Sequence, residues 1–366
     1  MNISKQYNMS IMMEIKGIPS IGNPERLPAS ISLPAELKML PIEIINPRDG
    51  SRQIYKQRCL ESSGGQVYEI GRILKEALFG YVYHACLLQK LDTGPTRRRS
   101  NSNNEEFETV YVRSSPLIEY AIKTYSRQAI ASSGNQAENP VNELAAIQYI
   151  GSLSYVIAQH ECCHDRSFLY SIMEFMEGGE LFEEILMNGK KDEAQARIIF
   201  SQILEGVYNI HSKGIVHRDL SLENVLVSRR HGLVKIIDLG MCLKVPFDSN
   251  TNSYMLIPKQ GSCGKMNYMA PEVFSNEGPF DPFLCDIWAL GIILFILLAG
   301  VPLLESPSPL DLRYIEVVSG RLGLLIAKWG IQVSPDAVDL IQNILKANPI
   351  ERLTIEQIKA HRWFST

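Results

Sequence analysis

The spacing of apolar residues changes about halfway along the chain. From Tyr68 to Lys123 the apolar positions come in short runs, such as Val82-Tyr83, separated by polar or Gly-containing stretches, which predicts strands. After Gly178-Gly179 they recur at helical spacing over longer segments. One such helix is expected to begin at a capping Asp192 and to end at Gly214. Its apolar face is expected to bury Ile198, Ile199, Ile203, Val207 and Ile210.

This change predicts an α+β protein of two lobes with a cleft between them, where ligand sites usually lie. The smaller, strand-rich lobe is expected over residues 67–177 and the larger, helical lobe over residues 178–366. Residues 1–66 are rich in Pro, Ser, Asn and Gly without a sustained period, so an irregular arm is expected there. The polar stretch at about 92–109, with Arg97-Arg98-Arg99, is interpreted as a loop insertion.

Composition narrows the class of protein. The 366 residues are 45% hydrophobic and 21% charged with a net charge of −4, typical of a soluble globular protein and without reason to expect nucleic-acid or membrane-surface binding. Seven cysteines are scattered without a C-x-x-C pair, and the first residues lack a secretory apolar core. We therefore expect a cytoplasmic monomer, with the nucleus as the alternative location. The apolar run Ile287–Gly300 is interpreted as a buried helix.

Residues suited to phosphoryl transfer follow one another in order. That reaction needs a lysine on the phosphates, ligands for ATP-bound Mg²⁺ and a carboxylate to take the hydroxyl proton. A three-residue match arises easily by chance, but five pieces in order at these spacings do not. The five pieces are Ala121-Ile122-Lys123, Glu143, His217-Arg218-Asp219-Leu220 followed by Asn224, Asp238-Leu239-Gly240, and Met269-Ala270-Pro271-Glu272.

On these motifs the chain resembles the protein kinase family, serine/threonine branch, over nearly all of its length beyond the arm. The resemblance implies the two-lobed kinase fold and transfer of the γ-phosphate of Mg-ATP to protein Ser or Thr. It implies that Asp219 is the catalytic base and that Lys123, paired with Glu143, positions the α- and β-phosphates. It makes Asn224 and Asp238 the ligands of Mg²⁺.

The nucleotide site follows from the same resemblance. Residues 172–182 look like the hinge of calcium/calmodulin-dependent and cyclic-nucleotide-dependent kinases, and His361-Arg362-Trp363-Phe364 resembles their closing motif. Met173 matches the gatekeeper position. The implied ATP-binding residues are Gly80, Val82, Ala121, Lys123, Met173, Glu174, Met176, Glu180, Leu226 and Asp238.

Two carboxylates suggest which protein substrates are used. Glu180 and Glu223 match positions at which basophilic kinases bind arginines before the target residue. Substrates with Arg before Ser or Thr are therefore expected. Autophosphorylation is expected at Ser100 or Ser102, which follow the three arginines of the insertion.

Three departures from the family pattern are visible. Lys75 and Ala77 stand where the first two glycines of the phosphate-binding loop belong, and Glu76 at the expected tip would add negative charge near the triphosphate. Ser221 replaces the usual catalytic-loop lysine, while Lys265 replaces the threonine that usually faces it, so Lys265 is a candidate catalytic cation.

The third departure is in the activation segment, which is long and polar. Gly261 aligns with the usual phosphorylated threonine, leaving Ser262 nearby, with Arg218 available to hold a phosphate.

Three alternatives stay open at this stage. The altered glycine loop allows a pseudokinase scaffold with weak or no catalysis. A kinase of small molecules would share the fold but does not need the Ala270-Pro271-Glu272 segment. The run His160–His164 contains possible metal-binding side chains, although its spacing fits no common zinc site.

Overall fold

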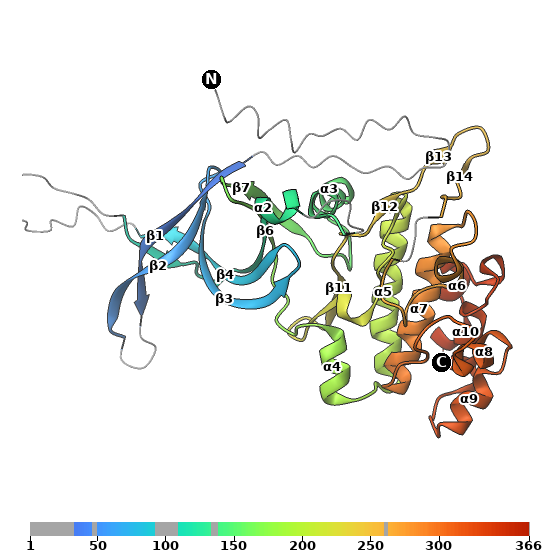
Figure 1. Ribbon diagram of the computed structural model, residues 1–366. Helices are drawn as coiled ribbons and strands as arrows, with labels where there is room; N and C mark the ends of the chain where they lie inside the picture. The colour runs from blue at the N-terminus through green and yellow to red at the C-terminus, as the bar shows by residue number, and fades with distance from the viewer. Residues whose placement is uncertain (1–32, 46–49, 92–108, 133–137, 260–262, 366) are drawn as a thin grey trace, which may run out of the picture. The chain divides into compact units, whose positions relative to one another are not determined.

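The computed structural model describes residues 33–45, 50–91, 109–132, 138–259 and 263–365 (Figure 1). The chain divides into two compact units. The sheet unit comprises residues 30–136 and 158–175, and the helical unit includes residues 137–157 and 176–366. The predicted α+β class, with a smaller strand-rich part and a larger helical part, is confirmed.

The described residues of the sheet unit form eight strands and one short helix. Its elements are β1 (Leu33–Ile45), β2 (Arg52–Ser62), β3 (Val67–Ala77), β4 (Gly80–Lys90), β5 (Tyr111–Arg113), β6 (Glu119–Ser126), α2 (Arg127–Ser132), β7 (Gln159–His164) and β8 (Phe168–Glu174). The strand order is β2-β3-β4-β5-β1-β7-β8-β6, with additional pairings of β1 with β2 and of β4 with β6.

These pairings close the sheet on itself. Going round, β1 pairs with β2, β2 with β3, β3 with β4, β4 with β6, β6 with β8, β8 with β7 and β7 with β1. The last pairing is parallel and joins Leu33 to Cys163. In a closed ring, alternate residues of each strand face the interior. The buried interior residues are Leu60, Tyr68, Ala85, Ile122, Cys163, Tyr170 and Ile172.

The prediction of an irregular arm up to residue 66 is therefore wrong for β1 and β2. Leu33, Ala35 and Leu37 pack against the interior cluster, while Pro34 and Glu36 between them are exposed, which is the period of a half-buried strand. Composition averaged over the whole segment hid this alternation. The predicted insertion is flanked by β4 and β5, but residues 92–108, with the predicted autophosphorylation sites Ser100 and Ser102, lie outside the described residues.

The helical unit contains the following elements. They are α3 (Pro140–Ile150), α4 (Leu181–Asn188), α5 (Glu193–Ser212), β9 (Ile215–Val216), η1 (Leu222–Asn224), β10 (Val225–Ser228), β11 (Leu233–Ile236), β12 (Leu243–Lys244), β13 (Phe247–Asp248), β14 (Ser253–Tyr254), α6 (Pro271–Ser275), α7 (Pro282–Ala299), α8 (Leu312–Val318), α9 (Leu322–Lys328), α10 (Pro335–Ile344), η2 (Pro349–Glu351), α11 (Ile355–Lys359) and η3 (Arg362–Phe364).

Helix α5 forms where the apolar period predicts it. The carboxylate of Asp192 caps its start by accepting a hydrogen bond from the amide of Gln195, 2.8 Å away. Ile203, Val207 and Ile210 are buried as expected, but Ile198 is 60% exposed. Ile198 lies five residues before Ile203, which at about 100° per residue turns it away from the buried face.

Helix α7 forms the centre of the helical unit. Its side chains from Asp286 to Leu298 are buried, among them Trp288. Among the described residues, α7 is the one helix that by length and composition is long and apolar enough to cross a membrane. However, 83% of it is buried inside the protein. That burial is what the core helix of a globular domain shows.

Candidate active site

A buried carboxylate of α7 holds the catalytic loop. Asp286 is 1% exposed, and its Oδ1 accepts the amide of Arg218 at 2.9 Å. Its Oδ2 accepts hydrogen bonds from the backbone amide of His217 and from the ring Nε2 of His211, both at 2.8 Å. Burial by itself raises the pKa of this carboxyl, but the bonds from His211 and His217 outweigh it and the pKa is lowered. Because two of these bonds come from the backbone amides of His217 and Arg218, they fix the path of the loop itself.

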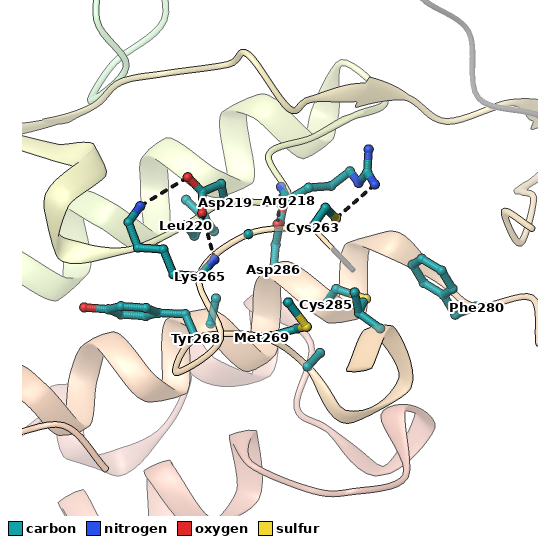
Figure 2. A pocket seen from close by; sticks show the side chains of 14 residues that line it. Arg218, Asp219, Leu220, Cys263, Lys265, Tyr268, Met269, Phe280, Cys285 and Asp286 are labelled. Atoms are coloured by element: carbon teal, nitrogen blue, oxygen red, sulfur yellow. Dashed lines mark hydrogen bonds and ion pairs between the residues drawn. The ribbon is translucent and has the colours of Figure 1, made fainter. Parts of the chain in front are cut away.

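The side chain of Asp219 is fixed from two directions. The amide nitrogen Nδ2 of Asn224 donates to the carbonyl oxygen of Asp219 at 2.7 Å and to its Oδ2 at 2.8 Å. From the activation segment, the backbone amide of Lys265 donates to Oδ1 at 3.2 Å. Figure 2 shows this bond and places the carboxylate between the loop and the segment. A carboxylate oriented in this way is suited to act as a general base.

The ammonium group of Lys265 lies at the same carboxylate (Figure 2). Its Nζ is 3.2 Å from Oδ2 of Asp219 and 3.0 Å from Oγ of Ser221, which is fully buried. The preceding Gly264 makes the approach possible: its φ is +84°, and a Cβ there would lie 2.7 Å from the carbonyl oxygen of Arg218. The contact between positions 221 and 265 expected from the sequence is therefore present in the structure.

The segment around Asp238 follows strand β11. Asp238 has a φ of +64°, uncommon for a residue other than glycine, and its Oδ1 accepts the amide of Gly240 at 3.2 Å. His217 is fully buried, and its ring Nε2 lies 2.9 Å from the carbonyl oxygen of Ile237. This contact joins the loop of Asp219 to the residue that precedes Asp238.

Two side chains of the helical unit fit Mg²⁺. The nitrogen of Asn224 is bonded to Asp219, so its amide oxygen is the atom that it can offer to a metal. Together with the carboxylate of Asp238, this gives an oxygen donor set. Mg²⁺ in nucleotide sites is typically held by one or two protein oxygens together with substrate phosphates. Within the described ranges no group of three or more His, Cys, Asp or Glu could hold a metal by itself.

In the sheet unit, four of the expected nucleotide residues share one face, whereas Glu174, which pairs with Tyr120, projects to the other. Val82 pairs with Lys123, and Ala121 pairs with His84 and with Met173. Residues directly opposite each other in neighbouring strands project to the same side of the sheet. Along one strand, every second residue projects to the same side. Val82, Ala121, Lys123 and Met173 therefore line one face. The Nζ of Lys123 lies 5.3 Å from the ring centroid of Tyr125 on that face.

The predicted glycine loop is a tight hairpin. The register of strands β3 and β4 shifts between Ile70 and Ile73 and again between Ile73 and Lys75. From Lys75 the strands are paired up to Ala77 and Gly80, so only Leu78 and Phe79 form the turn. Gly80 lies close to β6, where a Cβ would be 2.2 Å from the carbonyl oxygen of Thr124. The amide of Ser126 donates to the carbonyl oxygen of Phe79 at 2.7 Å.

The hairpin register corrects the expectation for Glu76. Glu76 pairs with Tyr81, whereas Lys75 pairs with Val82. Because successive residues of a strand alternate in direction, Glu76 projects to the face opposite Val82 and Lys123. The carboxylate of Glu76 is therefore on the face opposite the expected triphosphate. Lys75 projects to the same face as the expected triphosphate.

Several expected site residues belong to different units. Lys123 is in the sheet unit and Glu143 is in the helical unit, so their ion pair remains a prediction. The same holds for the adenine pocket. Its residues Val82, Ala121, Met173 and Glu174 are in the sheet unit, and Met176, Glu180, Leu226 and Asp238 are in the helical unit.

Sequence reasoning missed the partner of the catalytic-loop arginine. One guanidinium nitrogen of Arg218 lies 2.9 Å from Sγ of Cys263, and another donates to the carbonyl oxygen of Met241 at 3.2 Å. Burial raises the pKa of the Cys263 thiol. The only signal in the sequence was the position of Cys263, directly after the candidate phosphorylation site Ser262, which lies with Gly261 outside the described residues.

A cavity of about 30 Å³ lies beside these residues, lined among others by Arg218, Asp219, Cys263, Lys265 and Cys285 (Figure 2). Small-molecule sites usually measure about 300–1,000 Å³, so this cavity is too small for a nucleotide.

Comparison with known proteins agrees with this geometry. The family described as protein kinase domain matches residues 110–364. CBL-interacting protein kinase 1 of Oryza sativa subsp. japonica is 34% identical over 311 residues, which cover 84% of this chain and 58% of that relative. CBL-interacting serine/threonine-protein kinase 1 of Arabidopsis thaliana is 32% identical over 302 residues, or 81% of this chain and 58% of that protein.

The chain spans about half the length of the curated relatives that it matches, for example 49% of CBL-interacting protein kinase 21 of Oryza sativa subsp. japonica. These relatives are named CBL-interacting kinases. The hinge had suggested a different group, the calcium/calmodulin-dependent and cyclic-nucleotide-dependent kinases. The family match covers well over half of the chain and includes the catalytic loop and its anchoring helix. The chain belongs to the protein kinase domain family.

Proposed function

We propose that the protein is a serine/threonine kinase, which transfers the γ-phosphate of Mg-ATP to a hydroxyl group of a protein substrate. The observation that carries this proposal is the fixed carboxylate of Asp219. It is held by Asn224 and Lys265, on a loop whose amides are bonded to Asp286. The names of the relatives, which include the words serine/threonine-protein kinase, support the choice of hydroxyl acceptor.

In the proposed mechanism Asp219 orients the substrate hydroxyl and takes its proton as the oxygen attacks the γ-phosphorus, while the bond from that phosphorus to the bridging oxygen breaks and ADP leaves. Lys123 positions the α- and β-phosphates. Asn224 and Asp238 would hold Mg²⁺, which neutralises phosphate charge when bound. Negative charge is redistributed between the nucleotide and the acceptor oxygen, and the ammonium of Lys265, 3.2 Å from Asp219, is placed to stabilise it.

The same residues weigh against a pseudokinase. The base, both expected metal ligands and the strand lysine are all retained, and the cation missing at Ser221 has a replacement that touches it, Lys265. A small-molecule kinase is less well supported, because the Ala270-Pro271-Glu272 segment is typical of kinases with protein substrates. In this chain Glu272 forms a bidentate ion pair with the buried Arg352, with both N–O distances at 2.7 Å.

The proposed substrates carry arginine before the target residue. Glu180 and Glu223 both lie in the helical unit. Burial and the charge of Glu223 raise the pKa of the Tyr268 hydroxyl, so this hydroxyl lies close to the Glu223 carboxylate. A guanidinium group that reached the same carboxylate would gain a strong charge-assisted bond.

The relatives' names refer to interaction with CBL, but the names do not say which part of each relative binds. The chain matches 58% of the first of them, so its partner is proposed only at the level of protein substrates.

Transfer of radiolabelled phosphate tests the proposal. The parent protein and Lys123→Met are incubated with labelled Mg-ATP and a generic basic protein, and phosphoamino acids are then identified. The proposal expects label on serine or threonine with the parent and none above background with Lys123→Met. Label on a small-molecule acceptor alone, or no transfer by the parent, would contradict it.

A further inference from the structure

The face of the sheet unit that carries Lys123 holds a second cation. Lys75 pairs with Val82, and Val82 pairs with Lys123, so the three residues lie in register across β3, β4 and β6. Opposed residues in paired strands project to one side of the sheet. Lys75 and Lys123 are two strand spacings apart, about 10 Å between their backbones.

The backbone near Lys75 is engaged within the sheet unit. Residues 75–77 are paired with residues 80–82. The carbonyl oxygen of Phe79 accepts the amide of Ser126 at 2.7 Å, and Oγ1 of Thr124 bonds to both the amide and the carbonyl oxygen of Tyr81 at 3.0 Å. A glycine-rich loop holds phosphates through free backbone amides that approach closely. In this hairpin the amide of Tyr81 is bonded to Oγ1 of Thr124 and is therefore not available to a phosphate.

The positive and the negative side chain of the β3–β4 hairpin project to opposite sides of the sheet. Lys75 projects to the side of Lys123, and the neighbouring Glu76 projects to the opposite side with Tyr81. The lysine side chain is a point charge on a flexible four-carbon stem, able to follow a polyphosphate. The carboxylate, which would repel a polyphosphate, is on the other face.

We infer that Lys75 is a phosphate-binding residue, which supplies a side-chain cation to the triphosphate where related kinases use glycine amides. This inference rests on the proposed function, since it takes the face of Lys123 as the nucleotide face. It predicts that Lys75 contributes to the binding of the phosphates and not to the binding of adenosine.

Binding of Mg-ATP and of adenosine is measured by calorimetry on the full chain. Lys75→Met should weaken Mg-ATP binding about tenfold, the size of one lost charge-assisted bond, and leave adenosine binding unchanged. Lys75→Arg keeps the charge and should bind Mg-ATP within about threefold of the parent. Lys90→Met is the matched control, an exposed lysine at the far end of β4, and should change neither affinity.

Equal affinity of Lys75→Met and the parent for Mg-ATP would overturn the inference, and so would an equal loss for ATP and adenosine. A parent protein that binds Mg-ATP in a Lys75-dependent way but transfers no phosphate would support the inference and contradict the proposed kinase activity. A parent that binds no nucleotide would contradict both.

Discussion

The ammonium nitrogen of Lys265 lies 3.0 Å from the hydroxyl oxygen of Ser221. Kinases of the serine/threonine branch usually have lysine at the position of Ser221 and threonine at the position of Lys265, so cation and hydroxyl have changed places. In this chain the ammonium group of Lys265 also lies 3.2 Å from Oδ2 of Asp219.

The exchange can be tested by mutation. Lys265→Ala should lower turnover about 10- to 100-fold with little change in ATP affinity, because the cation acts on charge that develops during transfer. The double change Ser221→Lys with Lys265→Thr should recover much of the loss. Steady-state kinetics on one protein substrate measures both effects. A Lys265→Ala enzyme as fast as the parent would remove Lys265 from the mechanism.

The catalytic base gives a second prediction. Asp219→Asn keeps the shape of the side chain but cannot take a proton, so transfer should fall by at least about 10²-fold. ATP binding, measured by calorimetry, should stay near that of the parent, since the carboxylate is not an adenine contact. Near-normal turnover of Asp219→Asn would show that another group is the base.

Substrate preference gives a third prediction. Glu223→Gln should raise the KM of a peptide with Arg before the target serine about tenfold, because one charge-assisted bond is lost. The KM of the same peptide with Ala in place of Arg should stay unchanged, which is the control. A peptide library that shows no preference for basic residues would contradict the proposal for Glu223.

Acid unfolding tests the anchor of the catalytic loop. The pKa of Asp286 is lowered from 3.8, so its contribution to stability is complete above about pH 3.8 and is lost as the pH falls toward the lowered value. Asp286→Asn should cost about 3–5 kcal/mol of unfolding free energy at neutral pH, because it disrupts a buried charged network.

Urea unfolding of Asp286→Asn, repeated down to pH 3, should show this difference begin to shrink below about pH 3.8, because the carboxylate of the unfolded wild-type chain takes up a proton there before that of the folded protein does. Glu305→Gln is the control: its side chain is 85% exposed in an ion pair with Arg313, so the change should cost less than about 1 kcal/mol. A constant difference across the acid range would mean that the Asp286 charge is not responsible.

The closed sheet gives a fifth prediction. Leu60 of β2 is fully buried in the ring, so Leu60→Ala should destabilise the protein by about 2–5 kcal/mol. Met39 of β1 is 59% exposed, and Met39→Ala should change stability by less than about 0.5 kcal/mol. Urea unfolding distinguishes them. Equal stability of Leu60→Ala and the parent would show that β1 and β2 do not belong to the folded core.

Local signals in the sequence were sufficient for the helices and for the catalytic loop. Helix α5 has its own cap and its own period, so Asp192 and the apolar positions from Ile203 onward could be identified without knowledge of the partner surfaces. The loop from His217 to Asn224 could be identified because its chemistry needs particular residue types at short, fixed spacings.

Tertiary structure decided what depends on register and on distant partners. Leu33 pairs with Cys163, 130 positions away, and no local pattern records a pairing over such a distance. In the same way, Lys75 and Glu76 are neighbours in the sequence, and only the pairing of Lys75 with Val82 decides which of them lies on the face of Lys123. A side chain of a strand projects to one of the two faces of the sheet, and a shift of one residue in register moves it to the other face.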